Sequence, residues 1–143
     1  MSTNSLIGIL NKEKRTVKSI YCHWDGYLEG VGDELATNYK DVDKVRELIE
    51  LGDLSGLNTN IKPKGLTHTF DKPEDDVCVF YHRDRGEDWE HVKPFECALF
   101  DFAHEARKRG AQFAYYFDVE ENEWNYCILG YDEFNTLDEG RFV

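Results

Sequence analysis

Residues 19–32 read Ser19-Ile-Tyr-Cys-His-Trp-Asp-Gly-Tyr-Leu-Glu-Gly-Val-Gly32, and they continue a run that is rich in β-forming residues. These fourteen positions hold a cysteine, a histidine, an aspartate, three aromatic residues and three glycines. A turn that only reverses the chain does not need so many different functional groups. We therefore interpret the stretch as the end of a strand followed by a glycine-bent rim, and we expect a functional site there.

The strand predicted over Thr16–Trp24 sends alternate side chains to opposite faces. One face is expected to carry Ile20, Cys22 and Trp24. The other is expected to carry Ser19, Tyr21 and His23. Because neighbours on a strand point apart, the pattern argues against a Cys22–His23 dyad.

Asp25 has two interpretations. It could orient His23 for general-base work, or it could cap the turn while Trp24 and Tyr27 pack beneath it. The sequence favours the turn for Asp25 and Trp24, and it leaves the role of His23 open.

The remaining chain predicts a single α+β domain, residues 1–143, with a mixed or mainly antiparallel sheet and two main helices. The main helices are expected at Asp41–Leu51, with Asp41 as N-cap and Gly52 as stop, and at Phe95–Arg109, with Gly110 as stop. A shorter helix is expected near Asp33–Tyr39, and a long loop at Asp53–Gly65. Strands are expected at Leu6–Leu10, Thr16–Trp24, Leu66–Phe70, Val77–Arg85, Ala111–Val119 and Trp124–Leu129.

The 143 residues carry a net charge of −12, from 29 acidic and 17 basic side chains. This balance disfavours direct binding to nucleic acid. It is typical of a solvated acidic surface, and it is also compatible with mimicry of nucleic-acid charge against the basic groove of another protein. The aromatic share of 14% is compatible with a homo-oligomer.

The four cysteines form no CxxC pair, and each lies in an apolar or strand-like run. A disulfide framework or zinc ribbon is therefore not expected. No apolar run reaches the length of a membrane span, and no secretory leader is recognisable. These features together predict a cytoplasmic protein without a membrane partner.

A second motif, Tyr81-His-Arg-Asp-Arg85, ends the strongest predicted strand. Arg83 and Arg85 could form ion pairs with Asp84, Glu87 and Asp88. Alternatively, they could hold a phosphate or carboxylate through their planar guanidinium groups. Both interpretations are open, and we expect this motif to lie beside the rim formed by residues 19–32.

No nucleophile elbow, phosphate loop or dinucleotide fingerprint occurs. His23, Asp25, His82, Asp84 and His91 do not match the ligand spacing of a known metal site. We therefore expect no metal and no cofactor. The candidate ligand-binding residues are Tyr21, His23, Trp24, Asp25, Tyr27, Tyr81, His82, Arg83 and Arg85.

The motif Ser19–Tyr27 followed by Glu29-Gly-Val-Gly32 resembles a family of small proteins encoded by bacteriophages and prophages. Ile7–Asn11, Lys44–Leu54 and Tyr81–Glu87 are also similar to that family. The likeness covers roughly residues 6–90, and residues 91–143, read as a helix, a hairpin and an acidic tail, show none. The resemblance implies an accessory role in the infected bacterial cytoplasm, and it carries no named activity.

Three hypotheses follow. In the first, the protein is non-catalytic and counters host defence by sequestering a small anionic, nucleotide-type ligand, with aromatic residues on the base and arginines on phosphate. In the second, its acidic surface inhibits a host protein, as a nucleic-acid mimic would. In the third, His23 or His82 serves a hydrolase as acid or base.

Overall fold

The computed structural model describes residues 2–130 and 133–137. Its helical segments are η1 (Leu28–Gly32), α1 (Asp33–Asn38), α2 (Val42–Glu50), α3 (Tyr81–Arg85), α4 (Trp89–Val92), η2 (Leu99–Asp101) and α5 (Phe102–Lys108). Its strands are β1 (Ser5–Asn11), β2 (Thr16–Cys22), β3 (Leu54–Gly56), β4 (Val79–Phe80), β5 (Phe95–Ala98), β6 (Phe113–Asp118), β7 (Glu123–Ile128) and β8 (Asn135–Leu137).

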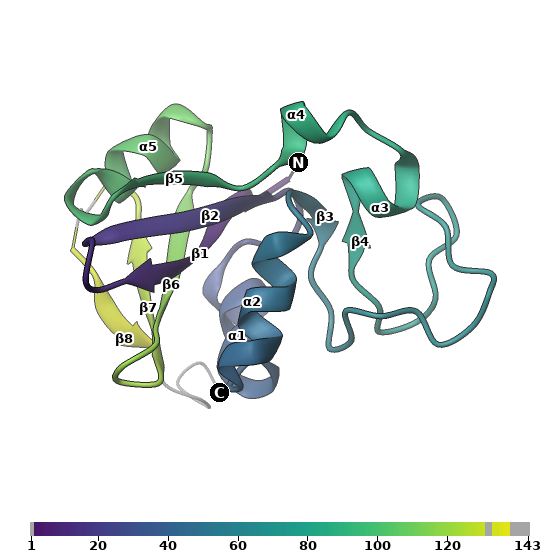
Figure 1. Ribbon diagram of the computed structural model, residues 1–143, viewed down its shortest axis with the longest axis horizontal. Coiled ribbons are helices and arrows are strands. Elements are labelled where there is room, and N and C mark those ends of the chain that lie inside the picture. The colour runs from purple at the N-terminus through teal and green to yellow at the C-terminus, as the bar shows by residue number, and fades with distance from the viewer. Residues whose placement is uncertain (1, 131–132, 138–143) are drawn as a thin grey trace.

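The strands form one sheet in the order β4-β3-β2-β1-β6-β7-β8, and β5 pairs with β2 outside this path. The pairs β1–β6 and β2–β3 are parallel, whereas the other pairs are antiparallel. The expected α+β fold with a mixed sheet is therefore confirmed (Figure 1).

Two hairpins join strands that were predicted next to each other in the sequence. In β1–β2, Ser5 lies opposite Cys22 and Asn11 lies opposite Thr16. In β6–β7, Phe113 lies opposite Ile128, and the carboxylate of Asp118 accepts hydrogen bonds from the next turn's backbone N–H groups, those of Glu120 and Glu121. Local turns and alternating side chains are enough to set both pairings.

The sheet is covered on both faces. Figure 1 shows α1 and α2 at one side of the sheet and α5 at the other. Ile7, Ile20 and Cys22 pack with Leu35 of α1 and Leu48 of α2. The opposite core contains Leu6, Val17, Phe102, Ala106 and Ala114. Alternate residues of β1 and β2 therefore enter different cores, as the period of a strand requires.

The helix predicted at Asp41–Leu51 is confirmed as α2. Asp41 caps it by accepting a hydrogen bond from the backbone N–H of Asp43, at 3.0 Å. Val45, Leu48 and Ile49 are buried. Gly52 follows with a φ of +84°, a conformation that favours glycine.

The strand predicted at Val77–Arg85 is mostly wrong. Only Val79–Phe80 forms a strand, and the chain then turns into α3, which ends at Gly86 with a φ of +77°. The carboxylate of Asp84 accepts a hydrogen bond from the backbone N–H of Phe80 at 2.8 Å. This bond satisfies a donor at the helix start, so it overrides the local preference for a strand.

The helix predicted at Phe95–Arg109 is wrong in its first half. Phe95–Ala98 forms β5, in which Ser19 lies opposite Phe95 and Thr16 lies opposite Ala98, and α5 begins only at Phe102. The free edge of β2 supplies backbone partners that a helix would not reach, so tertiary pairing decides the conformation. Phe102 and Ala106 are fully buried, whereas Phe95 and Leu99 are half-buried.

The strand predicted at Leu66–Phe70 is also wrong, because these residues are irregular and Leu66 is fully exposed. The predicted loop Asp53–Gly65 begins with the short strand β3 and is irregular afterwards. We call residues 57–76 the long loop.

All four cysteines are free thiols; Cys22, Cys78 and Cys127 are buried and Cys97 is half-buried. In the predicted tail, Leu137 is buried and Phe134 is half-buried, while Tyr131 and Phe142 lie outside the described residues. No helix in the described part of the chain has the length and apolar character needed to cross a membrane.

Candidate functional site

The turn after β2 continues the pairing toward β3. The backbone N–H groups of His23 and Trp24 donate to the carbonyls of Leu54 and Ser55, at 3.1 and 3.0 Å. Asp25 then adopts a φ of +57°, and its carbonyl accepts from the N–H of Val31 at 2.8 Å. This bond closes the turn onto η1 and fixes the direction in which the Asp25 side chain leaves the backbone.

Two glycines make this turn possible. A Cβ atom at Gly30 would lie 2.3 Å from the carbonyl oxygen of Asp25. One at Gly26 would lie 2.9 Å from backbone atoms of Thr3 and Asn4. The turn is therefore packed too closely for any larger residue at either position.

The aromatic residues of the turn remain accessible. Trp24 is 46% exposed and Tyr27 is 38% exposed, so they do not pack beneath Asp25 as the turn interpretation expected. The hydroxyl of Tyr27 donates to the Asp25 carboxylate at 3.2 Å. That carboxylate raises the pKa of the Tyr27 phenol. The ring of His23 packs edge-on against Trp24, with centroids 4.7 Å apart.

The expected separation of Cys22 from Tyr21 and His23 is confirmed. Cys22 is fully buried with Ile20, and burial raises its thiol pKa to about 12. Tyr21 packs against the opposite core, and its hydroxyl lies 2.9 Å from Nδ1 of His23. Trp24 departs from the predicted face, because β2 ends at Cys22 and alternation ends with it.

Asp53 joins the two motifs, and the sequence did not indicate it. Its carboxylate accepts from the N–H of Tyr21 at 2.8 Å, and its backbone carbonyl accepts from the N–H of Tyr81 at 3.2 Å. Burial raises the pKa of Asp53 to about 6. Since Cys22 pairs with Leu54 and Leu54 with Phe80, the two motifs lie on either side of β3.

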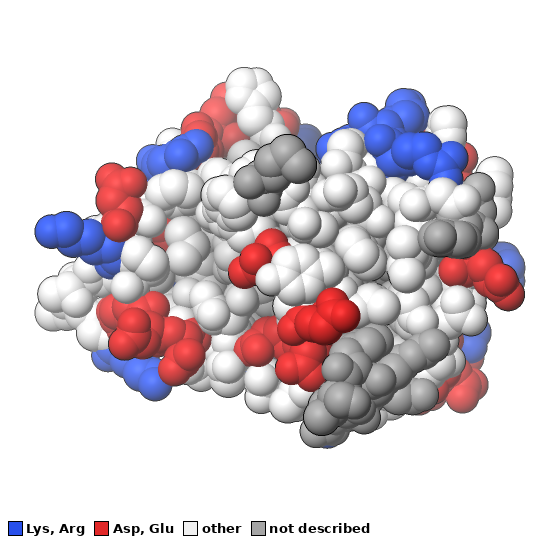
Figure 2. Space-filling view, turned by 180° about the vertical axis from the view of Figure 1, so that it is seen from behind, with Lys and Arg blue, Asp and Glu red and all other residues white. Residues whose placement is uncertain are grey.

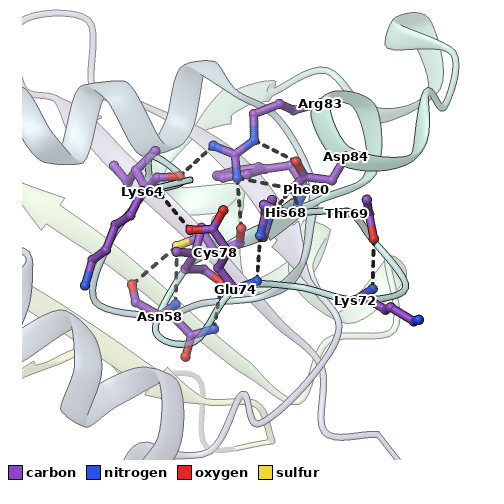
Figure 3. A network of polar contacts seen from close by, with 12 residues as sticks. Asn58, Lys64, His68, Thr69, Lys72, Glu74, Cys78, Phe80, Arg83 and Asp84 are labelled. Carbon is purple, nitrogen blue, oxygen red and sulfur yellow. Dashed lines mark hydrogen bonds and ion pairs between the residues drawn. The ribbon is translucent and has the colours of Figure 1, made fainter. Parts of the chain in front are cut away.

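Arg83 is held within the fold. Its guanidinium donates to the carbonyls of Ile61 and Cys78, at 2.6 and 2.9 Å, and to both carboxylate oxygens of Asp84, at 2.9 and 3.1 Å. The contact with Asp84 is an ion pair, one of the two roles that the sequence left open for Arg83. The bond to Ile61 directs the side chain toward the long loop (Figure 3).

Asp84 also faces His68, a residue that the sequence presented as an ordinary strand position. Nδ1 of His68 accepts from the N–H of Glu74 at 2.9 Å, so Nε2 carries the proton of the neutral ring. Nε2 lies 3.2 Å from the Asp84 carboxylate, off the direction of an ideal hydrogen bond.

The pKa of Asp84 reflects these opposing influences. Burial alone would raise it, but hydrogen bonds from Arg83 and from the Phe80 N–H outweigh burial and hold the pKa below its ordinary value. Glu74 in turn accepts from the N–H groups of Lys64 and Gly65. The network of Arg83, Asp84, His68 and Glu74 therefore fastens the long loop to α3 (Figure 3).

Arg85 and His82 face the surface. Arg85 forms an ion pair with Glu87, and its guanidinium lies over the rings of Phe70 and Tyr81, at 4.4 and 5.2 Å from their centroids. Nδ1 of His82 lies 2.8 Å from the carbonyl oxygen of Glu87. Both side chains therefore have a partner in Glu87, two residues after Arg85 in the chain.

A hollow of about 510 Å³ lies between the turn after β2, the start of α1 and the long loop. Its walls include the rings of Trp24 and Phe70, together with the four carboxylate side chains of Asp25, Glu29, Asp33 and Glu34. None of the described residues that line it is a lysine or an arginine. Sequence reasoning identified Trp24 and Asp25 but missed Glu29, Asp33, Glu34 and Phe70.

A second hollow, of about 390 Å³, lies beside the β1–β2 turn and has mixed charge. Its basic residues Lys12, Lys18 and Arg46 are matched by Glu13, Glu96 and Glu120. Lys12 is paired with Asp118 and Glu120, at 3.3 Å each. This hollow therefore has no excess of positive charge for an anion.

Among residues 2–130 and 133–137, no group of three or more histidine, cysteine, aspartate or glutamate side chains could hold a metal ion. No protein-family model matches the chain, and no curated protein or solved structure matches it. The likeness to phage proteins therefore remains a prediction, and the geometry of the hollow is the main basis for a function.

Proposed function

We propose that this protein is a non-catalytic binding module that attaches to a basic surface of another protein. The observation that carries the proposal is the hollow beside Trp24, whose described lining residues include four carboxylates and two aromatic rings but no lysine or arginine. Exposed aromatic residues commonly anchor protein interfaces, and complementary charge steers the partners together.

The distribution of charge supports a basic partner. Figure 2 views the molecule from behind, and acidic side chains gather over the centre and lower half of this face while basic side chains lie mostly near its margin. With a net charge of −12, the whole molecule attracts cationic surfaces over roughly the Debye length, about 8 Å in physiological salt. The grooves of DNA- and RNA-handling proteins are surfaces of this kind.

Sequestration of a nucleotide-type anion has less geometric support. It relies on Arg83 and Arg85 to hold phosphate, but Arg83 already donates to Asp84 and to two carbonyls, and Arg85 is paired with Glu87. An anion in the hollow itself would face four carboxylates. We therefore favour a protein partner over a small anion.

The biological setting of the proposal comes from the resemblance to phage proteins. On that basis we propose an accessory protein that acts on a host protein in the cytoplasm of an infected bacterium. Inhibition of host defence is the role that this setting suggests, by analogy alone.

Affinity purification from phage-infected cells tests the proposal. The tagged wild type is compared with the pair Glu29→Lys and Asp33→Lys, and with the control pair Asp43→Lys and Glu50→Lys. All four residues are exposed, and both pairs change the net charge by the same amount. We expect the wild type and the control to retain a basic protein that the first pair loses and that high salt releases.

Equal retention by both pairs would contradict an interface at the hollow. Recovery of an intact nucleotide instead of a protein would favour sequestration. A chemically altered ligand would indicate an enzyme.

A further inference from the structure

We infer that the hollow beside Trp24 binds the guanidinium group of one arginine side chain of the partner, stacked on an aromatic wall and bonded to surrounding carboxylates. This inference rests on the proposed function and names the group that the site recognises. A volume of about 510 Å³ falls within the range of roughly 300–1,000 Å³ that is typical of small-molecule pockets, so a whole side chain can enter.

Among residues 2–130 and 133–137, no cation neutralises the carboxylates of the hollow. Asp25 accepts from the Tyr27 hydroxyl, and Glu34 accepts from the side chains of Asn38 and Thr59, at 3.2 and 2.8 Å. These donors are uncharged, so they orient the carboxylates and leave their charge in place. In the described part of the chain, no ion pair joins a lysine, arginine or histidine to any of the four.

Lys44 of α2 has partners outside the hollow. Nζ of Lys44 donates to the carbonyls of Asn38 and Thr59, at 2.7 Å each, and lies over the ring of Tyr39. It therefore stabilises the connection between α1 and the long loop. With these partners, Lys44 forms no ion pair with a carboxylate of the hollow.

The aromatic walls suit a planar cation better than a compact one. Phe70 already lies under the guanidinium of Arg85, at 4.4 Å from its centroid, so Trp24 is the wall that offers an exposed ring. Trp24 is 46% exposed, and its contact with the His23 ring restricts its orientation. A guanidinium stacks on aromatic faces and offers five N–H donors, whereas an ammonium is a compact, strongly hydrated charge.

A metal ion is a poorer occupant of the same hollow. A divalent cation requires several oxygen ligands converging at roughly 2.0–2.6 Å. The described residues contain no group of three or more carboxylate, histidine or cysteine side chains with that convergence. Carboxylates that are spread around a cavity can instead each bond a different edge of an extended organic cation.

The walls are held in place before a ligand arrives. Asp25 is fixed in a left-handed conformation by the bond from Val31 to its carbonyl. The long loop, which supplies Phe70, is fastened by the contacts of Arg83 and His68 with Asp84. A preformed site loses less conformational entropy on binding.

The test is a titration of the isolated protein with N-acetyl-arginine-N-methylamide, followed by the indole N–H resonance of Trp24 in NMR spectra. The lysine and citrulline analogues of the probe are titrated in parallel, since citrulline keeps the shape of arginine without its charge. We expect a saturable shift with arginine, a clearly weaker one with lysine, and none with citrulline.

Two matched variants locate the binding. Asp33→Asn and Asp43→Asn each remove one exposed carboxylate from the first turn of a helix, α1 or α2. We expect Asp33→Asn to weaken arginine binding about three- to ten-fold and Asp43→Asn less than about two-fold. An unshifted Trp24 resonance, equal binding of citrulline or lysine, or equal effects of the two variants would overturn the inference.

This titration needs no partner protein, so its failure is distinct from failure of the proposed function. If arginine does not bind while the Glu29 and Asp33 substitutions still abolish capture of a basic protein, the inference fails and the proposed function stands. If arginine binds in the hollow but capture is unaffected by these substitutions, the proposed function fails.

Discussion

The turn after β2 and the helix α3 lie on either side of β3, and each carries charged and aromatic residues, but their charges have different surroundings. In α3, Asp84 is almost completely buried and contacts Arg83, His68 and the backbone. In the turn, Asp25 and Trp24 are exposed, and the partner of the Asp25 carboxylate within the described part of the chain is the neutral hydroxyl of Tyr27. Two motifs of similar composition therefore differ in role: the charges of α3 hold the fold together, whereas those of the turn are open to solvent.

The largest effect is expected at Asp84. Asp84→Ala removes the counter-charge of the Arg83 guanidinium and the acceptor of the Phe80 N–H, and the loss of one partner from a buried ion pair costs about 3–5 kcal/mol. Urea unfolding measures this change. Glu87→Ala is the control, because it removes the carboxylate of the exposed Arg85 pair and should cost less than about 1 kcal/mol. Similar costs for the two variants would remove the proposed contrast between the motifs.

Removing the charge of Asp53, which lies between the two motifs, should raise the free energy of unfolding, whereas Asp84→Ala should lower it. Its folded-state pKa of about 6 exceeds its ordinary 3.8, so the protonated form contributes stability below pH 4 that is lost as the pH rises through about 6. Asp53→Asn keeps an oxygen for the Tyr21 N–H and cannot ionise. At pH 7.5 it should stabilise the protein by about 1–3 kcal/mol, since one pH unit corresponds to about 1.4 kcal/mol.

The advantage of Asp53→Asn should vanish near pH 4, where the wild-type carboxyl is protonated. Urea unfolding at several pH values between 4 and 7.5 measures the difference. A difference that does not change with pH would show that Asp53 ionises normally in the folded protein.

Trp24 tests whether the exposed turn after β2 contributes to the stability of the fold. Trp24→Ala should change the free energy of unfolding by less than about 1 kcal/mol, because the side chain is already 46% exposed, yet it should abolish capture of the partner. Trp124→Ala is the contrasting variant, since Trp124 is buried and donates to the carbonyl of Tyr39. It should cost about 3–5 kcal/mol. A large loss of stability in Trp24→Ala would mean that the turn is structural after all.

The smallest effect is expected at Asp25. Asp25→Gly removes the carboxylate but suits the left-handed backbone, so stability should rise by less than about 1 kcal/mol while arginine binding weakens. Thermal unfolding and the same NMR titration measure the two effects. Asp25→Asn is the control that removes the charge and keeps the side chain. Unchanged arginine binding in both variants would remove Asp25 from the site.

The parts of the fold that local interactions determine were predictable from sequence. The hairpins β1–β2 and β6–β7 follow from alternation around short turns, and α2 follows from its N-cap and apolar face. The mistakes at Val77–Arg85 and Phe95–Arg109 have different causes. In the first segment the Asp84 carboxylate bonds the backbone N–H of Phe80 four residues earlier, whereas the second segment pairs with the distant edge of β2.

The site was predictable only in part for a related reason. The motifs themselves stand out in the sequence, and strand pairing brings them to the two sides of β3. Asp53, by contrast, lies at the start of the predicted loop and His68 in a segment wrongly predicted as a strand, and their partners are 32 and 16 positions away along the chain. A single sequence does not contain the signal that would link such distant residues.

The shortness of β4 has a consequence for association between copies of the protein. This strand lies at one end of the sheet order, and an exposed edge strand invites pairing with another chain. After only Val79 and Phe80, however, the chain coils into α3, so the edge offers too few backbone groups to template a further strand. The same turn that directs Asp84 inward therefore protects this end of the sheet from edge-to-edge aggregation.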